Sequence, residues 1–233
     1  MINLLFEKVA FQYGEKTIFT NADFSLASGE AVCLLGANAS GKTTLMSIAA
    51  TLQSAGAGKI VWFEQPGTET AAIRKRMGYV PQEIALYQNM SPAENLRFFG
   101  RLYGIPGSVL PNRIAQACEV VGIDPQEKKK VMHLSGGMKR RVNIAVSLIN
   151  EPELLIMDEP TAGIDMLSRR SIAEAVAALV KRGRTVLFSS HYPDEISLLA
   201  NRVLLLRNGS ISERAVNDAS ENSTESIYRM MFE

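Results

Sequence analysis

A glycine-containing loop between an apolar run and a helix-like segment limits the folds open to this chain. The loop is "GANASGKTT", Gly36 to Thr44, and it follows "AVCLL" and precedes "LMSIAA". It matches the pattern G-x-x-x-x-G-K-[ST] in the strand, loop and helix order that a phosphate-binding loop requires. This context favours a phosphate loop over an ordinary turn of small residues before a core helix.

The chemistry of the loop follows from the concentrated negative charge of phosphates. Backbone N–H groups and a helix N-terminus attract such anions. Lys42 is expected to reach the β- and γ-phosphates, and Thr43 to bind Mg²⁺. The sequence therefore predicts that ATP and Mg²⁺ bind along the whole loop, which consists of Gly36, Ala37, Asn38, Ala39, Ser40, Gly41, Lys42, Thr43 and Thr44.

The segments around the loop predict an α/β fold. Residues 1–35 alternate apolar positions with turns and predict a small antiparallel layer that leads into a buried strand at Ala31–Leu35. A helix is expected over Lys42–Leu52. The short apolar runs "ELLIMDEP" and "RTVLFSS" flank a helix-like segment, which indicates parallel strands joined by crossover helices. "NRVLLLRNGSISERA" predicts a hairpin that turns at Asn208 and Gly209.

Between residues 83 and 150 the pattern becomes helical. Apolar residues recur at helical spacing, with Pro and Gly breaks between the segments. We therefore predict a P-loop NTPase core, with a mixed, mainly parallel sheet and flanking helices, an N-terminal antiparallel β layer and a helical insertion subdomain. The expected organisation is one domain over 1–233, with a core over 1–82 and 151–215, the helical subdomain over 83–150 and a loose polar tail over 216–233.

Composition gives little support to several classes of function. Lys and Arg together number 25 against 24 Asp and Glu, so no basic surface for nucleic acid is expected. Cys33 and Cys118 are far apart and belong to no CxxC or His-rich cluster, which gives little support to a disulfide or zinc site. No apolar run approaches the ~20 residues that span a bilayer, so we expect no membrane span.

Two adjacent carboxylates follow the apolar run "LLIM". Ligands of open α/β sheets bind at the carboxyl ends of the strands, so Asp158 and Glu159 are expected to face the phosphate loop. Asp158 suits Mg²⁺, directly or through water, and Glu159 suits polarising the attacking water. Taken alone, the pair could instead cap a helix.

The segment "LSGGM", Leu134 to Met138, predicts a second anion site. Ser135, Gly136 and Gly137 offer a hydroxyl and exposed backbone N–H groups at the start of a helix. In isolation, an ordinary helix capped by Ser135 would be the favoured interpretation of this segment.

The order of these motifs resembles the ATP-binding cassette (ABC) ATPases. The phosphate loop is followed by "VPQ", "LSGG", "LLIMDEP", "AGID" and "SSH", and the resemblance covers roughly residues 3–210. It implies a RecA-like ATPase core. It also implies roles for four further residues: Tyr13 would stack on adenine, Gln82 would sense Mg²⁺ and the attacking water, Asp165 would lie at a dimer interface, and His191 would bind the γ-phosphate.

The resemblance also implies a shared site. ABC cassettes pair head to tail, so Ser135–Gly137 of one chain would close the nucleotide site of a second. ATP binding would join the two chains and hydrolysis would separate them. The chain departs from the family at Ala39, where glycine is usual, and the added Cβ is expected to cost a small strain without preventing binding. Ala37 and Met166 replace common prolines and remove no catalytic group.

Three functions remain open at this point. "SPAENLRFFGRLYGIPG" and the "LSGGMKRR" region look most like cassettes of bacterial exporters for drugs, ions and polysaccharides. The chain would then be the ATPase subunit of a transporter, cytoplasmic and held at the inner membrane face by an integral membrane permease. The alternative is a soluble ABC ATPase acting on DNA or ribosomes, although such relatives usually carry a long coiled coil or two cassettes. A small-molecule kinase would leave "LSGG" and Gln82 without a purpose.

Overall fold

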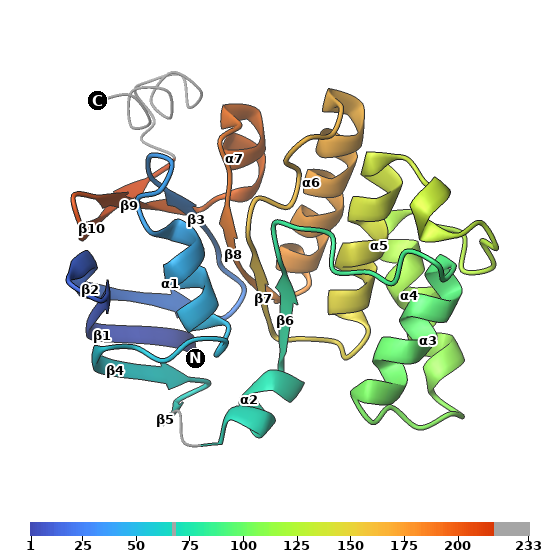
Figure 1. Cartoon of the computed structure of the whole chain (residues 1–233), viewed down its shortest axis with the longest axis horizontal. Coiled ribbons are helices and arrows are strands. Elements are labelled where there is room, and N and C mark those ends of the chain that lie inside the picture. Colours follow the sequence, from blue (N-terminus) through green and yellow to red (C-terminus); the bar gives the residue numbers. More distant parts are fainter. Residues whose placement is uncertain (67–68, 217–233) are drawn as a thin grey trace.

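The computed structural model describes residues 1–66 and 69–216. In Figure 1 one sheet and α1 lie on the left, a second sheet runs from the left to the middle, and a group of helices forms the right side. Val216 is the last described residue, so the rest of the predicted tail over 216–233 lies outside the described part of the chain. Within 1–66 and 69–216, no helix has the length and apolar character to cross a bilayer.

The first sheet is antiparallel and confirms the predicted N-terminal layer. Its core is a long hairpin of β1 (Ile2–Tyr13) and β2 (Lys16–Ala27). The hairpin turns at Gly14, whose φ of 56° lies in the left-handed region that favours glycine. The strand order β2-β1-β4-β5 adds two strands that the sequence did not predict, β4 (Ala57–Trp62) and β5 (Gln65–Pro66).

The second sheet is mixed and mainly parallel, as predicted. Its order is β10-β9-β3-β8-β7-β6, and all neighbours from β9 to β6 run parallel. The predicted hairpin at Asn208–Gly209 supplies the antiparallel edge strand. The strands are β10 (Ser210–Ala215), β9 (Arg202–Arg207), β3 (Ala31–Leu35), β8 (Thr185–Ser189), β7 (Leu154–Met157) and β6 (Met77–Val80).

The central strands of this sheet are buried on both faces. Every residue of β3, β7 and β8 is buried, as expected for parallel strands covered by layers on both sides. Cys33 and Met157 face one core with the helices α4 to α7, whereas Leu34 and Ile156 face a second core with α1 and the antiparallel sheet. Because β3, β7 and β8 run parallel, their carboxyl ends lie at the same edge of the sheet. Both cysteines are buried and unpaired.

Helix α1 (Lys42–Ala49) begins directly at the phosphate loop. The prediction that it extends to Leu52 is wrong. Thr51 has a φ of 59°, which is incompatible with a continuing right-handed helix. The indole N–H of Trp62 donates to the carbonyl of Ala49 across 2.8 Å and satisfies one of the free carbonyls at the helix end.

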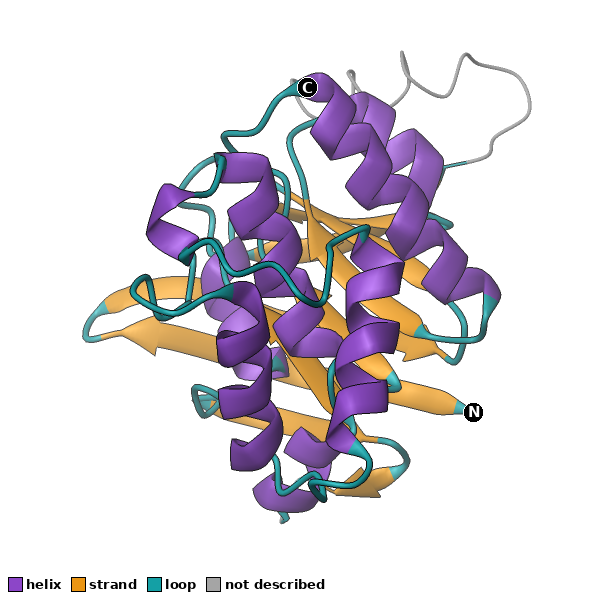
Figure 2. Cartoon of the chain, turned by 90° about the vertical axis from the view of Figure 1, so that its right-hand side faces the viewer, coloured by secondary structure: helices purple, strands orange, loops and turns teal. Residues whose placement is uncertain are grey.

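The remaining helices lie against the mixed sheet or form the group on the right of Figure 1. In Figure 2, seen from that side, these helices stand in front of the strands. Helix α3 begins with a capping box, in which Ser91 and Glu94 bond each other's backbone N–H groups. The division at residues 83 and 150 stays a prediction. The helices are α2 (Thr70–Lys75), α3 (Pro92–Leu102), α4 (Leu110–Val121), a 3₁₀ turn (Val131–His133), α5 (Gly136–Leu148), α6 (Met166–Lys181) and α7 (Pro193–Leu199).

Candidate functional site

The loop between β3 and α1 is packed too closely for larger residues at its two motif glycines. A Cβ on Gly36 would lie 2.6 Å from the carbonyl oxygen of Leu206. A Cβ on Gly41 would lie 2.4 Å from Ile18, and Gly41 has a φ of 108°. Both positions therefore require glycine for steric reasons.

Lys42 lies beneath this loop. Its ammonium donates to the carbonyls of Gly36, across 2.8 Å, and Ala37, across 3.1 Å. Only 6% of the residue is exposed. Burial lowers the pKa of Lys42, and the nearby carboxylates of Glu159 and Asp158 oppose that shift. The two carbonyls are neutral and compensate the charge of the Lys42 ammonium only in part. An anion bound in the loop would supply the missing negative charge.

Ala39 has a left-handed backbone. Its φ is 61°, and an L residue pays roughly 1–2 kcal/mol for this conformation. The strain expected from the sequence at this position is therefore present in the backbone of the loop.

Asp158, at the end of β7, is almost completely buried, with 1% exposed. Its Oδ1 accepts the hydroxyl proton of Ser189 across 2.7 Å. Its Oδ2 is buried without a hydrogen-bond partner. An unpartnered carboxylate oxygen is the kind of atom that a hard cation such as Mg²⁺ binds.

The described residues hold no cluster of three or more His, Cys, Asp or Glu side chains suited to a metal. Mg²⁺ usually takes one or two protein oxygens and completes its shell with phosphates and water, so it does not need such a cluster. Asp158 and Thr43 fit that role. Binding of Mg²⁺ stays a prediction.

The carboxylate of Glu159 is held from two sides. Oε2 accepts a hydrogen bond from Nε2 of Gln82 across 3.1 Å, and Oε1 lies 3.0 Å from Nε2 of His191. The backbone N–H of Glu159 donates to the hydroxyl of Ser189 across 2.8 Å. Glu159 also has a φ of 45°, a strained conformation of the kind that concentrates at functional sites.

One open cavity of 560 Å³ brings together most of the residues that the sequence singled out. It extends from the phosphate loop to the ends of β7 and β8. Tyr13 lines it and is half exposed, and its hydroxyl donates to Oε1 of Gln53 across 3.2 Å. The lining residues are Tyr13, Lys16, Ile18, Asn38, Ala39, Gly41, Lys42, Thr43, Thr44, Gln82, Glu159 and His191.

The second predicted anion site lies elsewhere. Ser135 caps α5 by accepting the N–H of Met138 across 3.3 Å, and Asp165 caps α6 in the same way through Ser168. These two helix starts adjoin each other, because a Cβ on Gly137 would lie 2.9 Å from the hydroxyl of Ser168. None of Ser135, Gly136, Gly137 and Asp165 lines the 560 Å³ cavity.

Sequence reasoning missed two polar side chains near the carboxylates. Ser189 bonds both Asp158 and Glu159, and Arg140 donates to the backbone of Gln82. Ser189 stands in the quoted "SSH" and could have been noticed as a hydroxyl at a strand end. Arg140 carried no such signal.

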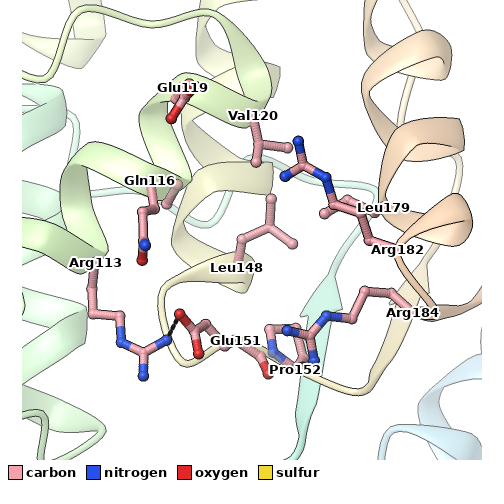
Figure 3. Close-up of a pocket in the computed structure, with 11 residues that line it drawn as sticks. Arg113, Gln116, Glu119, Val120, Leu148, Glu151, Pro152, Leu179, Arg182 and Arg184 are labelled. Atoms are coloured by element: carbon pink, nitrogen blue, oxygen red, sulfur yellow. Dashed lines mark hydrogen bonds and ion pairs between the residues drawn. The ribbon is translucent and has the colours of Figure 1, made fainter.

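A separate cleft of 360 Å³ lies between α4, the end of α5 and the end of α6 (Figure 3). Arg113 forms an ion pair with Glu151 there, and Arg184 donates to the Glu151 carbonyl. Leu148 and Leu179 form part of its wall. It contains none of the residues that the sequence singled out, so it is not part of the phosphate site.

Comparison with known proteins gives one family. The family model described as "ABC transporter" matches residues 19–162. The linearmycin resistance ATP-binding protein LnrL of Bacillus subtilis (strain 168) is 43% identical over 206 residues, which cover 88% of this chain and 66% of that protein. The Nod factor export ATP-binding protein I of Paraburkholderia xenovorans (strain LB400) is 37% identical over 205 residues, covering 88% and 67%. The chain thus spans about two thirds of the length of these relatives.

Solved structures agree with this fold. CbiO1 of Clostridium perfringens, part of the ABC transporter complex cbiONQ, superimposes with a TM-score of 0.84 at 25% identity, covering 99% of this chain and 92% of that one. The dimeric ATP-binding cassette MJ0796 bound to ADP and Pi superimposes with a TM-score of 0.82 at 23% identity, covering 92% and 99%.

Proposed function

The chain belongs to the ABC transporter family, and from that premise we propose that it is the ATP-hydrolysing subunit of an exporter. It binds ATP and Mg²⁺ in the 560 Å³ cavity. The observation that carries this proposal is the assembly around Glu159, which joins a general-base candidate to Gln82 and His191 opposite the phosphate loop.

Each residue has a defined part in the proposed reaction. Backbone N–H groups of the loop and Lys42 bind the phosphates, and Tyr13 stacks on the base. Thr43 and Asp158 hold Mg²⁺, which neutralises charge on the phosphates when bound. Glu159 accepts a proton from the attacking water, while Gln82 and His191 orient the carboxylate and contact the water and γ-phosphate.

The site is completed by a second cassette, identical or related. Ser135 and Gly136 are exposed and lie outside the chain's own cavity, and with Gly137 they close the site of a partner in a head-to-tail dimer. Two relatives with export or resistance in their names support the direction of transport.

A groove beside Gln82 supports docking of a membrane permease, which would hold the chain at the cytoplasmic face of the membrane. The groove has a volume of 280 Å³ and lies between the end of α1, β6, α3 and α5. Leu52, 57% exposed, stands at its rim, and its aromatic lining includes Phe99 and Tyr103. Exposed apolar surface of this kind marks sites for protein partners.

Two measurements test the proposal. Purified protein should release phosphate from Mg·ATP, and Lys42→Ala should remove both nucleotide binding and hydrolysis. A detergent-solubilised pull-down should yield an integral membrane protein, and Leu52→Glu should lose it, while the control Leu198→Glu, an exposed leucine on α7, should retain it. Recovery of ribosomes or DNA without a membrane protein would instead favour the soluble ABC ATPase.

A further inference from the structure

A buried arginine connects α5 to the loop that carries Gln82. Arg140 is 5% exposed, and its Nη1 and Nη2 donate to the carbonyls of Pro81 and Gln82 across 3.1 and 2.8 Å. The Gln82 side chain then donates to Glu159 across 3.1 Å. An unbroken series of contacts therefore leads from α5 to the proposed general base.

Stability alone does not explain this arrangement. A guanidinium taken out of water is expensive unless it is well paired. Within the described residues Arg140 forms no salt bridge, and its Nε is buried without a partner. Burial lowers the pKa of Arg140, and Glu159 opposes that shift through its charge. The two carbonyls are the direct partners that the buried charge has.

A second contact reinforces the attachment. Asn143 lies one turn after Arg140, and its Oδ1 accepts the N–H of Ala85 across 3.3 Å. One face of α5 thus holds the loop on both sides of Gln82. The N-terminus of the same helix carries Ser135–Gly137, about 4.5 to 7.5 Å before Arg140 along the axis at about 1.5 Å per residue.

We propose that Arg140 is a positioning residue that fixes the Gln82 backbone to α5. A displacement of the start of α5 then moves the Gln82 amide relative to Glu159. This rests on the proposed function, in which the start of α5 contacts the nucleotide of the partner cassette. Binding of the partner's nucleotide would in this way adjust the hydrolytic site of the chain that contacts it.

The next residue offers a matched control. Arg141 is a second arginine of α5, partly buried where Arg140 is buried, and its Nη1 donates to the carbonyl of Val121, at the end of α4, across 2.7 Å. It has the same side chain and the same type of hydrogen bond, but it has no contact with the Gln82 loop.

A double-mutant cycle on steady-state ATP hydrolysis tests the inference. Arg140→Gln should lower kcat about 10- to 100-fold, a cost typical of misplacing a catalytic group by about 1 Å, with the KM for ATP within about twofold. Arg140→Lys can satisfy one of the two carbonyls, so its kcat should lie between those of the wild type and Arg140→Gln. This variant keeps the test decisive if the glutamine variant fails to fold. In a Gln82→Ala background, Arg140→Gln should cost nothing further, because residues that act through one another are not additive.

Arg141→Gln should leave kcat near that of the wild type in both backgrounds. The positioning role would be overturned if the fold-losses in kcat of Arg140→Gln and Gln82→Ala multiplied in the double variant. It would also be overturned if Arg140→Gln left kcat unchanged. Either result would leave the ATPase proposal intact. A wild-type chain that hydrolyses no ATP would overturn the proposed function first and the inference with it.

Discussion

The hydroxyl of Ser189 donates to Oδ1 of Asp158 across 2.7 Å and leaves Oδ2 as the unpartnered oxygen. Ser189, at the end of β8, thereby fixes which oxygen of Asp158 is left to face a cation. The same hydroxyl accepts the N–H of Glu159, so a single side chain orients both acidic residues.

Ser189→Ala should therefore weaken Mg²⁺ binding. Loss of a group that orients a metal ligand typically costs about 10–100-fold in metal affinity. The concentration of Mg²⁺ that half-saturates ATP hydrolysis should rise by that factor. Ser190→Ala removes a neighbouring buried hydroxyl that bonds Glu195 instead, and it should not change the Mg²⁺ requirement. Equal shifts in both variants would argue against orientation of Asp158.

Glu159→Gln should abolish turnover while ATP still binds. A positioned general base contributes about 10²–10⁴-fold to a rate, and glutamine keeps the shape but not the basicity. Size-exclusion chromatography with Mg·ATP should show a trapped dimer. Glu174→Gln, on the exposed face of α6 beside Arg170, is the control and should behave as wild type. The head-to-tail dimer would be wrong if Glu159→Gln gave no more dimer than wild type.

Ala39→Gly should stabilise the protein slightly. The substitution relieves about 1–2 kcal/mol of left-handed strain. The greater conformational entropy of glycine in the unfolded chain offsets about 0.4–1 kcal/mol of this stabilisation. The melting temperature should rise by about 2 °C. Ala37→Gly, in the same loop without a positive φ, should lower it. If Ala39→Gly and Ala37→Gly lowered the melting temperature equally, Ala39 would be unstrained in solution.

Glu195→Gln should raise stability most at neutral pH. Burial raises the pKa of Glu195 above its ordinary value of 4.5, despite hydrogen bonds from Ser190 and Thr161 and the charge of Arg169. The folded state then binds the proton of the Glu195 carboxyl more tightly than the unfolded state does. The stability that this protonation contributes is fully present below pH 4.5 and is lost as pH rises through the raised pKa.

Melting curves from pH 4.5 to 7 should show this dependence. The amide oxygen of glutamine can still accept both hydroxyl protons, so Glu195→Gln should melt above wild type at pH 7, and the gap should close toward pH 4.5. Asp194→Asn changes an exposed neighbouring carboxylate and should not show the same convergence. A gap that stays constant with pH would exclude ionisation of Glu195 as its cause.

Much of the fold could be predicted because its signals are local. The apolar run Ala31–Leu35 and the Asn208–Gly209 turn specify a strand and a hairpin by themselves. Strand β4 carried no such signal. Gly58 has a φ of 85°, and the strand is defined by pairing with β1, about fifty positions earlier in the chain. The end of α1 likewise depends on a distant side chain, that of Trp62.

The candidate site divides in the same way. Contiguous motifs identified Lys42, Asp158 and Glu159, whose roles stay predictions. Ser189 and Arg140 act on partners 31 and 58 positions away, and only the folded chain brings them together. Their residue types are common, so spacing alone carries no information about them.

Trp62 is the single tryptophan of the chain, and it is 7% exposed with its indole bonded to the last residue of α1. Its intrinsic fluorescence therefore comes from one identified place, at the opposite end of the helix that starts in the phosphate loop. The tryptophan fluorescence of the unlabelled protein therefore reports on the packing at the end of α1. Every substitution discussed above leaves Trp62 in place, so the tryptophan fluorescence of all the variants comes from the same residue.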